Sequence, residues 1–160
     1  MNICDFLTEN RILSALAAPA KDGAIAALAA LVAQSHPQVD RFALDQALRE
    51  RERQSSTAVG EGVAVPHARF PGLTQTVAAF ARSTAGVDFE SLDGKPTHLF
   101  FLLVSPAEAP GPHLKILARV SRLLVDPQFR ARSMQAAGPG ELLAIFRQED
   151  QRAQSRLRAA

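Results

Sequence analysis

The spacing of apolar residues predicts two helices in the first third of the chain. In the first helix, apolar positions recur every three or four residues, at Ile25, Leu28, Leu31 and Val32. Asp22 is expected to cap its N-terminus, and the helix should end before His36-Pro37. A second helix is expected to start at Asp40 and to end at about Arg51–Arg53.

The middle of the chain predicts strands. Short apolar runs occur at 63–65, where Pro66 ends the run, at 76–82 and at 97–104. The last of these, THLFFLLV, is apolar enough to be buried on both faces. Asp93-Gly94 is a turn signal between the two longer strands, and residues 54–62, rich in Ser, Thr and Gly, are expected to form a loop.

The last third of the chain predicts helices again. Pro112 suits the first turn of a helix whose apolar stripe is Ile116, Leu117, Val120 and Leu124. Asp126-Pro127 should start the next helix, which Gly138 stops, and residues 141–147 should form the last one. We expect one domain over residues 1–150 and a polar, frayed tail over 151–160. Because helices and strands alternate, the predicted class is α/β, a single mixed β-sheet flanked by helices on both faces.

Composition narrows the classes of protein. At 160 residues with 47% apolar and 21% charged residues, the chain suits one globular domain and excludes a disordered protein. Its longest apolar run, Ala24 to Ala33, is about half of the ~20 residues that a membrane span needs. The N-terminus lacks the pattern of a signal peptide, and the single cysteine, Cys4, cannot form an internal disulfide. We therefore expect a cytoplasmic protein without membrane insertion.

Charge and motifs argue against several chemistries. The net charge is +2, the basic residues are scattered, and Trp and Tyr are absent, so nucleic-acid binding is disfavoured. No His, Cys or Asp spacing suggests a zinc site, and neither a P-loop nor a dinucleotide-binding glycine motif occurs. A GxSxG elbow is also missing. No metal and no cofactor are expected.

Two of the four histidines suggest phosphoryl chemistry. His36 and His98 are interpreted as structural, whereas Pro66 holds His67 rigidly at a strand end. Upstream of His67 lie hydroxyls and accessible amides that suit a phosphoryl group, at Ser55, Ser56, Thr57, Gly60 and Gly62. His113 continues a buried stripe in the first turn of its helix, where a neutral imidazole beside an anion is favoured.

Two arginines extend this pattern. Arg51 follows Leu44 by seven residues and Leu48 by three, so it is placed on the inward face at a helix end, where it requires an anion or carbonyl groups. Arg69 lies two residues after His67 and points to the same face of an extended segment, where it adds positive potential or is simply a surface residue. Cys4, near a terminus and without an obvious base, is interpreted as unreactive.

Residues 51–68, RERQSSTAVGEGVAVPHA, resemble the signature of the IIA domains of the bacterial phosphotransferase system, of the fructose/mannitol type that includes the nitrogen-regulatory IIA proteins. The resemblance implies that His67 is phosphorylated at Nε2, that His113 supports the phosphoryl group, and that Arg51 and Thr57 belong to the site. The other ring nitrogen of His67 should then donate to a backbone carbonyl. Ser55 and Ala58 replace glycines of the signature, which would strain the backbone if either position needed a positive φ.

This resemblance implies a phosphohistidine carrier that accepts its phosphoryl group from an HPr-like phosphocarrier protein (NPr). Two outputs are open. In the first, phosphorylation changes which regulatory target proteins bind, as in nitrogen- and potassium-linked control, because it adds ~1.5–2 negative charges. In the second, a sugar-specific IIA passes the group to a IIB domain. The lack of a fused membrane or carrier domain in this sequence favours the regulatory reading.

Overall fold

A six-stranded mixed sheet forms the centre of the computed structural model, which describes residues 1–160. The strands are β1 (Ile12–Leu13), β2 (Ala58–Gly60), β3 (Val63–Ala64), β4 (His67–Phe70), β5 (Val77–Val87) and β6 (Thr97–Pro106). Their order is β1-β5-β6-β3-β2, and β4 also pairs with β6. The long strands β5 and β6 are antiparallel, whereas β1 is parallel to β5 and both β3 and β4 are parallel to β6.

Strands β3 and β4 share one edge of β6. Val63 pairs with Leu99 and His67 pairs with Leu103, so the two short strands follow each other along β6. Between them lies Pro66, which has no amide hydrogen to donate to the sheet. The interruption at Pro66 therefore places His67 at the first position of a new strand.

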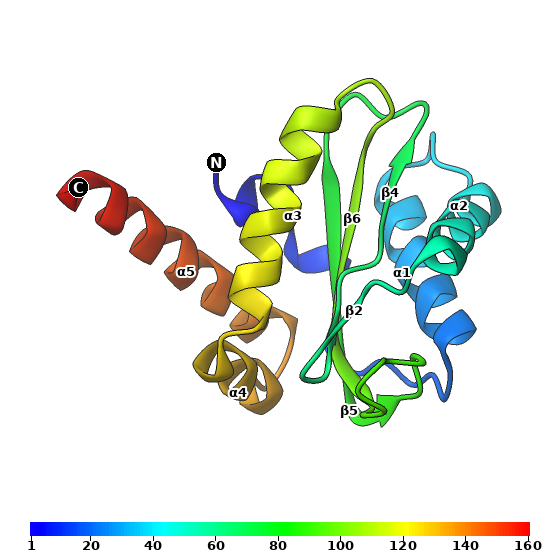
Figure 1. Ribbon diagram of the computed structural model, residues 1–160. Helices are drawn as coiled ribbons and strands as arrows, with labels where there is room; N and C mark the ends of the chain where they lie inside the picture. Colours follow the sequence, from blue (N-terminus) through cyan, green and yellow to red (C-terminus); the bar gives the residue numbers. More distant parts are fainter.

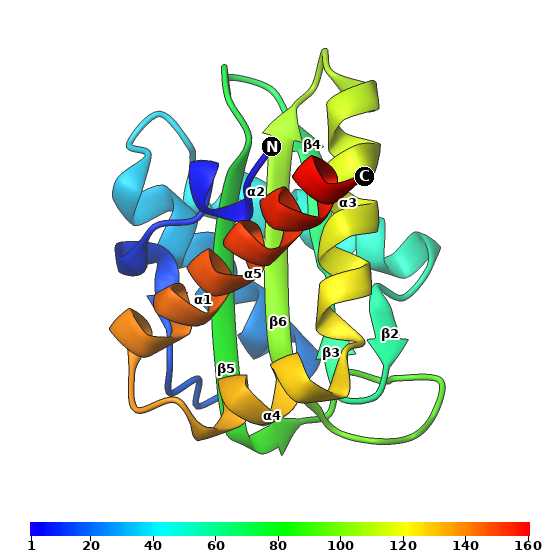
Figure 2. The same ribbon diagram turned by 90° about the vertical axis from the view of Figure 1, so that its left-hand side faces the viewer.

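Helices cover both faces of the sheet, as the alternation of elements predicts. On one face lie α1 (Lys21–Ser35) and α2 (Arg41–Gln54), and on the other lie α3 (Pro110–Leu124), α4 (Pro127–Gln135) and α5 (Pro139–Ala159) (Figures 1 and 2). Two short 3₁₀ turns, Ile3–Asp5 and Glu9–Arg11, precede β1. None of the helices combines the length and the apolar character needed to cross a membrane.

The sheet divides the core into two clusters because successive side chains of a strand point to opposite faces. On β6, Phe100 and Leu102 pack toward α1 and α2, while Phe101 and Leu103 pack toward α3 to α5. This confirms that the strand 97–104 is buried on both faces. In the second cluster the ring of Phe146 on α5 contacts three other aromatic rings, those of Phe80, Phe101 and Phe129.

Several boundaries confirm the sequence prediction, and one does not. Asp40 caps α2 by accepting a hydrogen bond of 2.8 Å from the Ala43 amide, and Asp126 caps α4. Asp22, however, is not an N-cap, because α1 begins at Lys21, two residues earlier than an Asp22 cap requires, and Ala20 is its cap. The Asp22 carboxylate instead lies in the first helical turn, where it suits the helix dipole.

Three further predictions were wrong in extent. Residues 58–60, expected to be loop, form β2. The strand expected to end at Arg82 continues to Val87 after a shift in its register with β6. The sequence pattern missed this part because it contains polar residues and Gly86, which has a positive φ. The tail expected to fray from residue 151 is helical to Ala159.

A buried carboxylate anchors the last helix to the rest of the protein. Asp150 on α5 accepts hydrogen bonds of 2.9 Å from the amides of Ile3 and Cys4, and Arg119 on α3 also donates to it. These bonds tie α5 to the N-terminus and to α3. The final turns continue the helix beyond the edge of the sheet (Figure 1).

Candidate active site

His67 is held with one ring nitrogen free. Its Nδ1 lies 2.8 Å from the carbonyl oxygen of Val65. A carbonyl oxygen only accepts hydrogen bonds, so Nδ1 carries the hydrogen and Nε2 keeps its lone pair. This confirms the expectation that a backbone carbonyl fixes the tautomer of His67. The half-buried ring therefore presents an unprotonated Nε2 at the start of β4.

His113 lies beside it. The two imidazole centroids are 5.6 Å apart, and His113 is 6% exposed in the first turns of α3. Its Nδ1 lies 2.7 Å from the hydroxyl oxygen of Ser105, which is at the end of β6. The structure thus brings together the two histidines that the sequence analysis singled out, 46 positions apart in the printed sequence.

Burial keeps both imidazoles neutral. It lowers the pKa of His67, and the positive charge of Arg51 lowers this pKa further, against the opposing effect of the Val65 hydrogen bond. Burial, together with His67, Arg69 and Arg51, lowers the pKa of His113 from 6.5 to about 4. At neutral pH the site therefore holds two uncharged imidazoles, one of them with an unprotonated Nε2, in positive surroundings.

Arg51 reaches the site from a different face of its helix than expected. It is half-exposed in the last turn of α2, and its Nη1 donates to the carbonyl oxygen of Ser55 at 3.0 Å. The inward position belongs to Glu52, because the buried stripe of α2 is Leu44, Leu48 and Glu52, at intervals of four residues. With Arg69, Arg51 lines a cleft of about 490 Å³ between α2 and β4.

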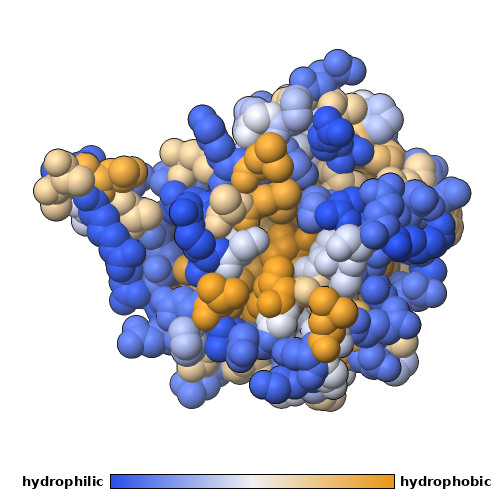
Figure 3. Space-filling view, in the orientation of Figure 1, coloured by the Kyte–Doolittle hydropathy of each residue, from blue (hydrophilic) through white to orange (hydrophobic).

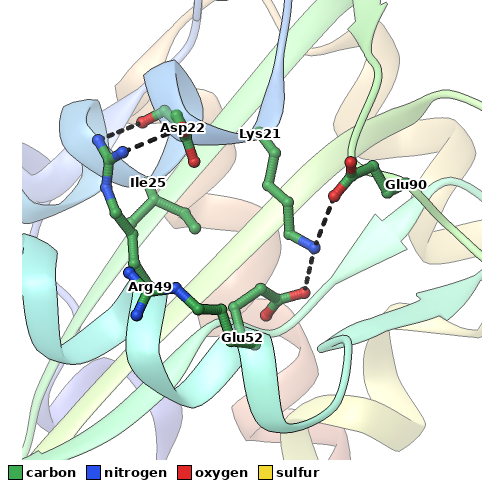
Figure 4. A pocket seen from close by; sticks show the side chains of 7 residues that line it. Lys21, Asp22, Ile25, Arg49, Glu52 and Glu90 are labelled. Atoms are coloured by element: carbon green, nitrogen blue, oxygen red, sulfur yellow. Dashed lines mark hydrogen bonds and ion pairs between the residues drawn. The ribbon is translucent and has the colours of Figure 1, made fainter.

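The buried carboxylate of Glu52 holds the loop that precedes β2. It accepts hydrogen bonds from the amide of Thr57, at 2.9 Å, and from the Thr57 hydroxyl. On its other side it pairs with Lys21 Nζ at 3.0 Å, which in turn contacts Glu90 at 3.4 Å (Figure 4). These bonds and the ion pair lower the pKa of Glu52 against the effect of burial, so its carboxylate is charged.

This arrangement changes the role expected of Thr57. Its amide and hydroxyl hydrogens are both donated to Glu52, so neither is available to a phosphoryl oxygen. The Thr57 carbonyl accepts from the Val65 amide at 3.0 Å, and the Val65 carbonyl accepts from His67. Thr57 thus connects Glu52 to Val65, the residue that holds the His67 ring. Sequence reasoning missed Glu52, although its place four residues after Leu48 on an apolar stripe was a usable signal.

Among the remaining predicted phosphate contacts, Ser56 directly precedes Thr57 in the segment that leads into β2. Its hydroxyl oxygen accepts from the Ala58 amide at 3.2 Å, which leaves its hydrogen available. Gly60 and Gly62 form the β2–β3 turn, where both have a positive φ. Gly62 adjoins Val63, which pairs with Leu99 on β6, whereas His67 pairs with Leu103. Four residues along a strand correspond to ~13 Å, so Gly62 lies about that far from His67 along the sheet edge. The structure does not bring these glycines to the histidines. They form the β2–β3 turn, whose positive φ values favour glycine, and this turn lies at the end of β3 away from His67.

The replaced glycines of the signature cause no strain. Among residues other than glycine, only Glu61 and Glu90 have a positive φ, and Ser55 is extended with φ −167°. Neither Ser55 nor Ala58 therefore requires the left-handed backbone that favours glycine.

The other candidate groups lie outside the site. His98 Nδ1 bonds to the Ser83 carbonyl at 2.8 Å, as expected of a structural histidine, and His36 Nδ1 contacts the Ser35 hydroxyl. Burial and the nearby Asp150 raise the pKa of Cys4 to about 12, so it stays a thiol. No three His, Cys, Asp or Glu side chains lie close enough together to hold a metal ion.

An apolar band runs over the face that carries the site. It lies between α3 and α2, with hydrophilic residues on both flanks (Figure 3). Leu114, the residue after His113, is 65% exposed, and Val59 on β2 is 44% exposed. An exposed apolar band bordered by hydrophilic residues is typical of a surface that binds another protein.

The sequence matches a known protein family over most of its length. Residues 5–149 match the family described as phosphoenolpyruvate-dependent sugar phosphotransferase system, EIIA 2. A nitrogen regulatory protein of Bradyrhizobium diazoefficiens is 44% identical over 126 residues, which cover 79% of this chain and 82% of that protein. A fructose-specific EIIABC component of Bacillus subtilis is 35% identical over 150 residues, 94% of this chain, and the chain spans only 24% of that longer protein.

Solved structures agree with the sequence relatives. The nitrogen regulatory protein IIA-Ntr of Neisseria meningitidis has a TM-score of 0.83 at 30% identity and covers 90% of this chain and 98% of its own. The mannitol IIA of Escherichia coli, at 22% identity, has the same fold with a TM-score of 0.72 over 88% of this chain and 98% of its own. The chain therefore belongs to the EIIA 2 family, the fructose/mannitol-type IIA domains of the phosphotransferase system.

Proposed function

We propose that the protein is a phosphohistidine carrier that accepts a phosphoryl group on Nε2 of His67 from an HPr-like phosphocarrier protein. The observation that carries the proposal is the hydrogen bond between His67 Nδ1 and the Val65 carbonyl, which leaves Nε2 unprotonated beside His113. Family membership supplies the reaction class, transfer of a phosphoryl group within the phosphotransferase system.

The transfer exchanges one phosphorus–nitrogen bond for another. The lone pair of His67 Nε2 attacks phosphorus in line, while the bond to the carrier's histidine breaks and its electron pair returns to the carrier nitrogen. The transition state is loose, with charge spread over three phosphoryl oxygens, so positioned donors and cations stabilise it. Arg51 and Arg69 line the cleft between α2 and β4, and their positive charges act on His113. The Ser56 hydroxyl, in the segment before β2, keeps a hydrogen to donate.

Val65 also stabilises the product. Once Nε2 carries phosphorus, the His67 ring bears a positive charge shared with its Nδ1–H, and the Val65 carbonyl oxygen accepts that hydrogen bond. Hydrogen bonds to a charged donor are roughly twice as strong as neutral ones. The same bond therefore selects the tautomer before transfer and supports the charged ring afterwards.

The test is phosphate incorporation from a radiolabelled, phosphorylated HPr-like carrier. We expect wild-type protein to gain an acid-labile, base-stable phosphate, His67→Gln to gain none, and the control His36→Gln to match wild type. Labelling of His67→Gln at the wild-type level would overturn the proposal.

For the output of the carrier, we favour phosphorylation-dependent regulation of other proteins. The support is the 44% identity to a nitrogen regulatory protein and the TM-score of 0.83 to a IIA-Ntr structure. A sugar-specific role, in which the group passes to a IIB domain, is the alternative, favoured by the fructose-specific relative. Incubating the phosphorylated protein with a purified IIB domain separates the two. Retention of the label fits the regulatory role, whereas rapid transfer to IIB contradicts it.

A further inference from the structure

The two histidines of the site have different partners at Nδ1. For His67 the partner is a carbonyl, which can only accept a hydrogen. For His113 it is the hydroxyl of Ser105, at 2.7 Å, and a hydroxyl can donate as well as accept. The tautomer of His113 therefore depends on where the single hydrogen of the Ser105 hydroxyl points.

A second hydroxyl decides that direction. Thr76, at the residue before β5, donates from its Oγ1 to the Ser105 oxygen at 3.4 Å. Ser105 itself is 1% exposed, so water does not compete for its hydroxyl. Besides Thr76, His113 Nδ1 is the only group that bonds to the Ser105 hydroxyl, so with Thr76 as donor the buried Ser105 hydrogen has Nδ1 as its one acceptor. Nδ1 of His113 is then the unprotonated nitrogen.

We propose that Ser105 is a positioning residue that holds His113 as the Nε2–H tautomer, so that His113 presents a hydrogen-bond donor to the phosphoryl group carried by His67. The proposal rests on the proposed function and adds to it a residue outside the family signature. Burial supports it, because an imidazole that stays neutral carries one ring hydrogen, whose place the hydroxyl can decide.

The two rings then serve complementary purposes. His67 has its hydrogen on Nδ1 and offers a lone pair at Nε2, while His113 has its hydrogen on Nε2 and offers a donor. In the opposite tautomer, His113 would present a lone pair, which repels a phosphoryl oxygen. One preorganised donor to a developing negative charge contributes about 10²–10³ in rate. Loss of Ser105 frees both tautomers without removing the imidazole, so we expect a smaller loss, of about 10-fold.

The test measures the tautomer directly. Long-range proton–nitrogen correlation spectra of the full chain, labelled with nitrogen-15 in histidine, report which ring nitrogen bears hydrogen. The variants His67→Gln and His113→Gln assign the signals. We expect wild-type protein at neutral pH to show Nδ1–H for His67 and Nε2–H for His113. A wild-type His113 with hydrogen on Nδ1 overturns the proposal, and this result requires no variant of Ser105 to fold.

Variants of Ser105 link the tautomer to the rate. Ser105→Ala should give a mixed His113 signal and about 10-fold slower labelling by the phosphorylated carrier. Ser105→Thr, which restores a hydroxyl, should recover both. An unchanged His113 tautomer in a folded Ser105→Ala protein overturns the proposal. Failure of the proposed function is a separate result, because the spectra do not depend on phosphate transfer and the labelling of His67→Gln does.

Discussion

The lowered pKa of His113 predicts that the protein loses stability in mild acid. The folded protein holds His113 at a pKa of about 4, below its ordinary value of 6.5, because burial and the positive surroundings disfavour the imidazolium. Between these two values the unfolded chain binds a proton that the folded chain does not. The stabilisation is therefore complete above about pH 6.5 and is lost as the pH falls toward 4.

The size of the loss follows from the two pKa values. At about 1.4 kcal/mol for each pH unit, the contribution of His113 decreases by about 2 kcal/mol between pH 6.5 and pH 5, and by about 3 kcal/mol on reaching pH 4. His113 is 6% exposed, so solvent screens this effect little. Other groups also titrate in this range, which makes a comparison of variants necessary.

Urea unfolding of wild type and His113→Gln, from about pH 7.5 to pH 5, isolates the effect of His113. We expect the difference in free energy of unfolding between the two proteins to change by about 2 kcal/mol over this range, with wild type losing more. The control His36→Gln, which changes a histidine at the end of α1, should keep the wild-type loss. Parallel pH profiles for wild type and His113→Gln would refute the assignment of this stabilisation to His113.

Two further predictions concern what holds the site and the core. Glu52→Ala removes three contacts of a buried carboxylate, leaves the Thr57 amide unpaired and leaves Lys21 with only the exposed Glu90 as a partner. Urea unfolding should therefore show a loss of about 2–4 kcal/mol in the free energy of unfolding, against a change within about 0.5 kcal/mol for Glu50→Ala on the exposed side of α2. A Glu52→Ala protein as stable as Glu50→Ala would show that this network does not hold the loop. Phe146→Ala should lower the free energy of unfolding by about 3–5 kcal/mol, because Phe146 is fully buried among three aromatic rings. Phe42→Ala, at a 71% exposed position, should lower it little. Equal losses for the two variants would contradict the place of Phe146 in the core.

The sequence could predict the parts of the site that depend on local pattern. Pro66 before His67 and the apolar spacing around His113 are both local features. His113 is buried in the first turns of α3, as that spacing predicts, whereas His67, expected at the end of the strand 63–65, begins the new strand β4. Arg51 and Glu52 show the limit of such reasoning. They are neighbours on one helix, so their inward or outward positions differ by ~100° of rotation, and only packing against α1 and the sheet decides which is buried.

Most hydrogen-bond partners could not be predicted from local pattern, although the family resemblance anticipated the bond between His67 and a backbone carbonyl. Nothing local indicates that Thr57 donates its hydrogens to Glu52, or that Gly60 and Gly62 turn the chain at the far end of β3. The helical end of α5 is a similar case. Its composition suggests a frayed tail, but the helix continues to Ala159, and both Asp150 and Gln154 bind residues 2–4 at the opposite end of the chain.

By itself, the sequence determined the α/β class, the helix caps at Asp40 and Asp126, the doubly buried strand β6 and the two histidines, since each depends on residue type and on spacing within one element. The tertiary structure alone decided which hydroxyl bonds to His113, which carboxylate is buried and which loop reaches the site. The physical reason is that hydrogen-bond direction and burial depend on neighbours from other elements, and only the packing of α2, β4, β6 and α3 around one edge of the sheet brings those neighbours together.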